Sequence, residues 1–332
     1  YVKFQRITAV VAALFLAATM SACSSGDSSQ SGQSGQAASQ SGDENRPAPS
    51  DEPKVDRSGT QTIPEVKGDF GEEPVITPST GSEPVDSIIA TTLVQGDGRE
   101  VQPTDAVQVA YKGVLWDGTE FDSTFKEGGK PIAFSLDRVI VGWKAGLTGQ
   151  HVGDRVELVI PWQWAYGEQG QASIPPKSTL TFVVDIHNAV DTADVDQLKS
   201  ATPTDAALPD GVTVEGDLGT APKLTLAEGA NPEPGTYLIS EGTGPELTKD
   251  NYAVLRAVEA VVGVQNEGQT QMWDVPNLAP VAKLVQLEGH KVGSRLMVVI
   301  DMADPRPTSD QSQSGEVQML RDVAIFDLAG SL

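Results

Sequence analysis

The first half of the chain contains stretches in which apolar residues alternate with polar or small ones. These stretches are residues 107–115, 155–160 and 179–186. An apolar period of two predicts strands that bury one face against a core. Between them, residues 138–149 allow one short helix, because Trp143 and Leu147 share a helical face and Gly149 suits its end. We therefore expect an α+β fold, in which an antiparallel sheet packs on one helix.

Blocks of the first half return in the second half in the same order. They are GDFGEEPVIT with GDLGTAPKLT, TTLVQGDGREV with TYLISEGTGPEL, HVGDRVELVIP with KVGSRLMVVID, and FVVDI with AIFDL. Chance similarity among strand-forming segments is the alternative, but the unchanged order favours two copies of one fold. We expect these copies at residues 66–190 and 212–332, joined by a linker at residues 191–211.

Residues 1–23 have the features of a secretory signal peptide. Basic residues precede an apolar run that is too short to span a bilayer comfortably, and small residues lead to Cys23. The pattern resembles a bacterial lipoprotein signal, in which the cysteine is lipidated. An ordinary cleaved signal with an incidental cysteine is the alternative. Residues 24–65 are polar and have few large apolar side chains, so we expect a disordered tether.

Composition and motifs exclude several functions. The net charge is −23, and such an acidic chain is repelled by nucleic acid, so we expect no nucleic-acid partner. We attribute the charge to solubility in preference to a specific basic partner. Cys23 is the only cysteine, which rules out an internal disulfide. The histidines lack metal-ligand spacing, and there is no phosphate-binding glycine loop or nucleophile elbow, so we expect neither a metal nor another cofactor.

Aromatic residues make up only 5% of the chain but gather in the first copy. There the chain reads VQVAYKGVLWDGTEFDSTF and then RVIVGWKAGLTGQHVGDRVELVIPWQWAYGEQGQASIPPKSTLTFVVDI. Residues 88–189 resemble an FKBP-type peptidyl-prolyl cis–trans isomerase domain over nearly its whole length. The resemblance implies a half-barrel of antiparallel strands wrapped on a short helix, with an apolar pocket that receives a proline ring.

The resemblance also implies roles for individual residues. Trp143 would form the pocket floor, Tyr166 would reach a substrate carbonyl through its hydroxyl, and Asp122 would be the polar group at the rim. Ile140 would offer its backbone N–H to the bound chain, and Ile174 would close the pocket from a loop. The walls would be Tyr111, Phe121, Val139, Ile140 and Phe182.

The pattern departs from the family on the loop side of the pocket. Ile132 stands where the family often has a pocket phenylalanine. The loop after Tyr166 is one residue short and has no histidine, which changes the contacts on which macrolide binding would depend. Trp162 and Trp164 lie beside Tyr166, and the sequence allows either packing within the loop or exposure to substrate.

The second copy keeps the framework segments and loses the pocket residues. Lys283 stands at the position of Trp143, and an unpaired ammonium group is too costly to bury as an apolar floor. Ala324 aligns with Phe182. We therefore predict a degenerate copy without isomerase activity, which would hold unfolded chains, pair with the first copy or act as a spacer.

The first copy predicts a peptidyl-prolyl cis–trans isomerase that assists the folding of exported proteins at the outer face of a membrane, held there by a lipid anchor. Its partners would be proline-containing unfolded or exported polypeptides. The alternative is a non-catalytic chaperone or peptide-binding lipoprotein. The sequence leaves the clients, the contact between the copies and the oligomeric state open.

Overall fold

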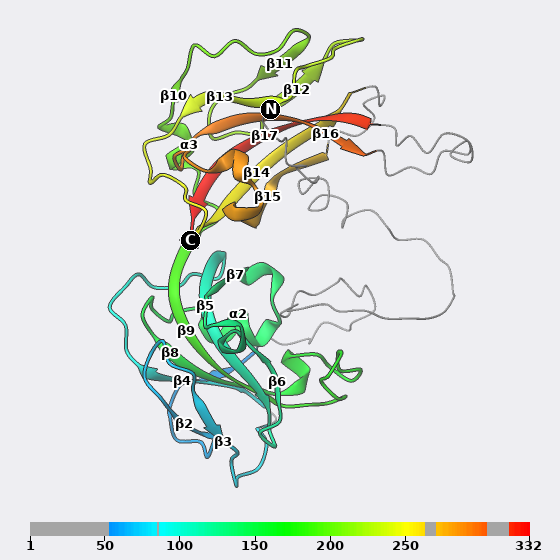
Figure 1. Ribbon diagram of the computed structural model, residues 1–332. Helices are drawn as coiled ribbons and strands as arrows, with labels where there is room; N and C mark the ends of the chain where they lie inside the picture. The colour runs from blue at the N-terminus through cyan, green and yellow to red at the C-terminus, as the bar shows by residue number, and fades with distance from the viewer. Residues whose placement is uncertain (1–52, 85, 263–269, 304–318) are drawn as a thin grey trace, which may run out of the picture. The chain divides into compact units, whose positions relative to one another are not determined.

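The computed structural model describes residues 53–84, 86–262, 270–303 and 319–332. The chain divides into two compact units, an N-terminal unit that ends at Asp191 and a C-terminal unit from Thr192 to Ser331 (Figure 1). The predicted signal peptide, the lipidation site at Cys23 and the tether up to residue 52 lie outside the described residues.

A seven-stranded sheet forms the N-terminal unit. Its strand order is β1-β4-β8-β9-β5-β6, and β7 also pairs with β5. The strands are β1 (Val55–Asp56), β4 (Ile88–Val94), β5 (Asp105–Leu115), β6 (Glu120–Ser123), β7 (Ile132–Ser135), β8 (Arg155–Ile160) and β9 (Leu180–Asp191). All pairs are antiparallel except β1 with β4, which is parallel. The predicted strands are confirmed as β5, β8 and β9.

The predicted short helix is confirmed as α2 (Val141–Leu147), which packs against β4 and β8. Its glycines allow this close packing, since a Cβ on Gly146 would lie 2.6 Å from Leu158 Cδ2. Gly149 has φ +81, the left-handed conformation that suits a residue just past a helix end. Single-turn 3-10 helices complete the unit: η2 (Phe125–Glu127), η3 (Leu136–Arg138) and η4 (Trp162–Trp164).

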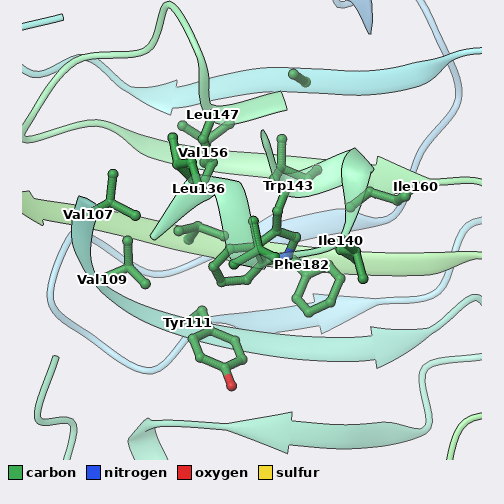
Figure 2. Packing of buried hydrophobic residues seen from close by; sticks show 14 of the residues in the cluster. Val107, Val109, Tyr111, Leu136, Ile140, Trp143, Leu147, Val156, Ile160 and Phe182 are labelled. Carbon is green, nitrogen blue, oxygen red and sulfur yellow. The ribbon is translucent and has the colours of Figure 1, made fainter. Parts of the chain in front are cut away.

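The inner face of the sheet and the helix enclose one apolar core. Figure 2 shows its centre, where side chains from β5, β8 and β9 meet those of α2. Val107, Val109 and Tyr111 alternate along β5 and are each at most 2% exposed. Trp143 and Leu147 reach the same core from α2, so the shared helical face predicted from their spacing is buried. The short helix is therefore stabilised by packing, because an isolated helix of this length is not stable in water.

A separate hairpin, β2 (Glu65–Lys67) with β3 (Val75–Thr77), is linked to this sheet by hydrogen bonds from an arginine that also forms a buried ion pair. The pair joins Arg155 Nε to Asp185 Oδ1 at 2.6 Å, and both side chains are at most 1% exposed. Arg155 Nη1 also donates to Gly68 O at 2.7 Å, and its Nη2 donates to Glu72 O at 2.6 Å. The ion pair thus fastens the hairpin turn to β8 and β9.

The prediction of a disordered tether up to residue 65 is wrong for residues 53–65. Val55 and Asp56 pair with Ile88 and Ile89 as the edge strand β1. Composition alone missed this strand because its backbone partner lies more than thirty residues further along the chain. Short edge strands depend on the neighbouring strand more than on their own side chains.

A six-stranded sheet forms the C-terminal unit, with the order β10-β13-β16-β17-β14-β15. Its strands are β10 (Thr202–Pro203), β13 (Gly235–Glu241), β14 (Tyr252–Val261), β15 (Thr270–Pro280), β16 (Arg295–Ala303) and β17 (Met319–Ser331). The hairpin β11 (Val212–Glu215) with β12 (Lys223–Leu226) is separate. The helices are α3 (Asp196–Lys199) and the 3-10 turns η5 (Val281–Lys283) and η6 (Val285–Leu287).

The predicted linker at residues 191–211 contains secondary structure in its first part. Asp191 ends β9, and the next residues form α3 and β10. Leu198 of α3 is only 1% exposed, and β10 pairs with β13. This segment belongs to the C-terminal unit because it buries an apolar side chain and adds an edge strand there.

The two sheets have the same strand order, in which β4, β8, β9 and β5 correspond to β13, β16, β17 and β14. Each unit also has a separate hairpin, β2 with β3 and β11 with β12. The C-terminal unit also repeats the buried ion pair, with Arg295 Nε 2.7 Å from Asp327 Oδ1 and Arg295 Nη2 donating to Thr220 O near its hairpin. When the two sheets are aligned on these ion pairs, Arg155 corresponds to Arg295 and Asp185 to Asp327. Two further alignments follow from the strand pairing: Tyr111 with Ala257 and Phe182 with Ala324.

Candidate active site

A pocket opens in the N-terminal unit where the inner face of the sheet meets α2. Its space, including the open mouth, is about 250 Å³. It is lined by Tyr111, Phe121, Asp122, Phe134, Val139, Trp143, Tyr166 and Phe182. These residues come from β5, β6, β7 and β9, from α2 and from the loops beside them. Strands far apart in sequence thus supply the walls of one cavity.

Trp143 lies at the centre of this aromatic set and is 2% exposed (Figure 2). Its ring centroid is 5.2 Å from that of Tyr111, 5.6 Å from that of Phe134 and 5.3 Å from that of Phe182. All three contacts are edge-to-face, the arrangement that the ring quadrupoles favour. The rings therefore hold one another in place around a fixed apolar surface.

The structure brings together most of the residues that the sequence singled out. Tyr111, Phe121, Asp122, Val139, Trp143, Tyr166 and Phe182 line the pocket. Ile140 and Ile174 do not line it with their side chains. Ile140 is fully buried in the core at the start of α2, and Ile174 is 8% exposed in the same core. Ile140, expected as a pocket wall, and Ile174, expected to close the pocket from a loop, thus pack in the core, and their contact with a bound proline stays a prediction.

Sequence reasoning missed Phe134. Ile132 stands where the family often has a pocket phenylalanine, and Phe134 follows two residues later on β7. Ile132 and Phe134 pair with Val109 and Val107 of β5, and residues two apart on a strand share a face. Phe134 thus supplies the phenylalanine ring that position 132 lacks. The signal was the short alternation Ile132, Phe134, which is hard to recognise in a strand of four residues.

Polar groups occupy one side of the pocket. The Tyr111 hydroxyl donates to Asp122 Oδ2 at 2.5 Å, which orients both side chains. Burial, with a smaller contribution from the negative charge of Asp122, raises the pKa of Tyr166 to about 12. Tyr166 therefore keeps its proton at neutral pH and can donate a hydrogen bond. Asp122 already accepts one from Tyr111, which suits an organising role.

The loop that carries Tyr166 has an unusual backbone. Gly167 and Gly170 have positive φ, and so do Ala172 and Lys177, where a side chain makes this conformation costly. Trp164 packs against the core, whereas Trp162 lies under Lys177, whose Nζ is 5.4 Å from its ring centroid. Both tryptophans are half-buried, so each is at least partly engaged in loop packing.

The described parts of the chain offer few sites for other chemistry. Within them, no group of three or more His, Cys, Asp or Glu side chains is arranged to hold a metal ion. The same residues include no helix with the length and apolar character needed to cross a membrane.

The region that contains the pocket is similar in sequence to known proteins. A sequence model described as FKBP-type peptidyl-prolyl cis-trans isomerase matches residues 97–187. FK506-binding protein 2 of Debaryomyces hansenii is 41% identical over 99 residues, which cover 29% of this chain and 73% of that protein. The chain therefore belongs to the FKBP-type peptidyl-prolyl cis–trans isomerase family, and its N-terminal unit has the FKBP-like fold.

Bacterial relatives match the same region. FkpA, an FKBP-type peptidyl-prolyl cis-trans isomerase of Escherichia coli K12, is 42% identical over 115 residues, which cover 35% of this chain and 40% of that protein. The FKBP-type 22 kDa isomerase of the same organism is 50% identical over 93 residues, which cover 28% and 45%. The chain thus spans less than half the length of these two relatives.

Proposed function

We propose that the N-terminal unit is a peptidyl-prolyl cis–trans isomerase. The observation that carries the proposal is the pocket lined by the aromatic rings that pack around Trp143, with Tyr166 also in its lining. A proline ring is apolar and compact, so such a pocket suits it. Family membership and the matching region of the relatives support the same activity.

The geometry accounts for catalysis without a proton transfer or a covalent intermediate. Rotation about the peptide bond costs about 18–20 kcal/mol because resonance gives the C–N bond partial double-bond character. A twisted amide loses that resonance and carries less charge on its oxygen. A water-poor aromatic pocket therefore favours the twisted state over the planar one, which is the differential binding that catalysis requires.

Hydrogen bonds would hold the flanking chain in the turned geometry. Tyr166 keeps its proton, because burial raises its pKa to about 12, and its hydroxyl would donate to a substrate carbonyl. The backbone N–H of Ile140, at the start of α2, would donate to another. Asp122, bound by the Tyr111 hydroxyl, would fix the rim of the pocket.

The test is the rate of cis–trans isomerisation of X-Pro peptides by the full chain, measured with a protease-coupled assay. We expect Trp143→Ala and Tyr166→Phe each to lower kcat/KM, the first more strongly because it removes the pocket floor. Rates of the wild type no higher than those of the double variant would disprove the proposal. Circular dichroism of each variant controls for loss of the fold.

We further propose that the C-terminal unit is a degenerate copy of the same fold. The shared strand order and the repeated arginine–aspartate pair support this. In that register Ala257 and Ala324 replace Tyr111 and Phe182, and the Lys283 side chain is exposed. A pocket for proline is therefore not expected there, and the C-terminal unit should supply no isomerase activity of its own when Trp143→Ala lowers that of the N-terminal unit.

A non-catalytic chaperone function would depend on the C-terminal unit. It predicts that the full chain with Trp143→Ala still suppresses the aggregation of an unfolded client. Loss of suppression together with loss of isomerase activity would leave the N-terminal pocket as the client-binding site.

We propose that the protein is exported and anchored by a lipid on Cys23, where it would act on proline-containing exported polypeptides. The signal-like residues 1–23 and the polar residues 24–52 support this location. In cells, Cys23→Ser should abolish labelling by a fatty acid and release the protein from the membrane fraction. Membrane retention of the variant without label would refute the lipid anchor.

A further inference from the structure

The segment that precedes the family-matched region is attached to the N-terminal unit at the edge of its sheet. Val55 and Asp56 form β1 beside β4, and Ile88 N donates to Lys54 O at 2.8 Å. Beyond the strand, Asp56 accepts a hydrogen bond from Ser58 N at 2.8 Å, which turns the chain. The backbone of Arg57 is therefore held between a paired strand and a turn.

From this position the Arg57 side chain reaches the C-terminal end of α2. Its Nη2 lies 2.7 Å from Thr148 O, 3.2 Å from Gly146 O and 3.4 Å from Ala145 O. The last carbonyls of a helix have no partner within the helix and carry the negative end of its dipole. A guanidinium group with several donors in a fixed fork suits this cluster of acceptors.

The end that Arg57 binds belongs to the helix that carries the pocket floor. Trp143 lies only one turn before the bound carbonyls of α2, which is seven residues long. Gly142 and Gly146 rest directly on Ile160 and Leu158 of β8, because an added Cβ would lie 2.3 Å and 2.6 Å from those side chains, so the backbone of this short helix packs closely on the strand. Because α2 is only seven residues long, a contact that fixes its C-terminal end also helps to fix the position of Trp143.

The C-terminal unit offers an internal comparison. Its edge strand β10 runs antiparallel to β13, whereas β1 runs parallel to β4. After β10, the Thr204 hydroxyl donates to the backbone carbonyls of Leu238 and Ile239 on the neighbouring strand. In the N-terminal unit, the segment after the edge strand thus binds the helix beside the pocket. In the C-terminal unit, the corresponding segment binds the neighbouring strand of its own sheet.

We propose that Arg57 is a positioning residue for the proline pocket, which it serves by fixing the C-terminal end of α2 and so the place of Trp143. The inference rests on the proposed isomerase function for its kinetic consequence, but its structural part stands independently. It also makes residues 53–61 part of the functional domain, although they precede the region matched by the family model.

The first experiment compares wild type, Arg57→Ala and Arg57→Lys in the full chain, with initial rates measured over a range of cis-peptide concentrations. We expect Arg57→Ala to lower kcat/KM by about two- to fivefold, the range set by a partly exposed cation at a helix end. The loss should lie mainly in a raised KM, because a displaced floor binds proline less well. Arg57→Lys should recover part of it, and Lys54→Ala, which changes an exposed side chain on the same segment, should match wild type.

A second readout separates positioning from stability. With 5-fluorotryptophan incorporated and Trp143 assigned by a Trp143→Phe variant, Arg57→Ala should shift the fluorine resonance of Trp143. Trp273, in the C-terminal unit, is the internal control and should not shift. A merely structural role would lower the active fraction, reducing apparent kcat with KM unchanged, and would overturn the proposal.

The experiments distinguish a failure of the proposed isomerase function from a failure of the proposed role of Arg57. An inactive wild type would disprove the proposed function, while the fluorine shift would still test the positioning. An active wild type with unchanged kinetics and an unshifted Trp143 resonance in Arg57→Ala would disprove the role of Arg57 alone.

Discussion

Gly113 lies where two pocket rings leave no room for a side chain. It lies on β5 opposite Asp122 of β6 and Phe182 of β9. A Cβ added there would be 2.7 Å from Phe121 Cζ and 2.9 Å from Phe182 Cε1, whereas ordinary contact begins at 3.4 Å. Gly113→Ala must therefore displace at least one pocket ring by about 0.7 Å.

The size of the effect follows from that displacement. Misplacement by about 1 Å can cost on the order of a hundredfold in rate, so we expect kcat/KM of Gly113→Ala to fall by about ten- to a hundredfold. The cost in stability should be small, because overpacking costs about 1–3 kcal/mol and replacing a strand glycine by alanine returns about 0.5–1 kcal/mol. Activity should thus fall far more than the free energy of unfolding.

The assay is peptide isomerisation, with the denaturation midpoint measured on the same samples. Gly235→Ala is the matched control, because Gly235 also lies on a strand but a Cβ there would meet only Tyr237 atoms, at 3.5 Å or more. It should keep wild-type activity. If Gly113→Ala folds and isomerises the peptide as fast as the control, then proline does not bind between these rings and the proposed site is wrong.

Further predictions concern charge and pH. Burial raises the pKa of Tyr166 to about 12, so kcat/KM should stay constant up to about pH 10, the ordinary tyrosine value, and a decline centred there would contradict the assignment. Burial raises the pKa of Glu157 from 4.5 to about 8; a raised folded-state pKa gives stability that is present at low pH and lost as pH rises toward 8. The free energy of unfolding should therefore fall from pH 5 to 8 and fall less steeply in Glu157→Gln, because Asp322, whose pKa burial also raises to about 8, still contributes. Urea titrations measure both slopes, and identical slopes would count against this explanation. Arg155→Ala leaves the buried carboxylate of Asp185 without its ion-pair partner and should lower the free energy of unfolding by about 3–5 kcal/mol. The double variant Arg155→Met, Asp185→Leu should recover most of that loss. Denaturation midpoints of the two variants decide, and equal losses would refute the ion-pair explanation.

The sequence predicted the parts of the fold that have a strong period of their own. Residues 107–115 and 155–160 alternate clearly because the face that packs on the core is apolar along its length, although the residues of β8 on the other face are buried as well. β7 escaped prediction because its four residues are all half-buried and show no contrast between faces. β1 escaped because two residues carry no pattern, and only the neighbouring β4 makes them a strand.

Some residues of the candidate site could likewise be predicted from the sequence, and others could not. Strand alternation could place Tyr111 on a buried face, and helical spacing could do the same for Trp143. Aromatic residues there are usually core, and only the family resemblance pointed to a pocket. Neither source could find Arg57. Its role depends on a parallel edge strand that brings it to Ala145 and Gly146, nearly ninety residues away.

The strand order of the N-terminal unit has a consequence for how this chain comes to be folded. β4, complete at Val94, pairs with β8, which begins only at Arg155, and β5 has its long pairing with β9, which ends at Asp191. A chain emerging N-terminus first therefore shows unpaired strand edges until nearly all of the unit has appeared. Folds built on such distant pairings close slowly and are prone to aggregate meanwhile. A protein proposed to hasten the folding of others thus has, by its own topology, a late and vulnerable closure.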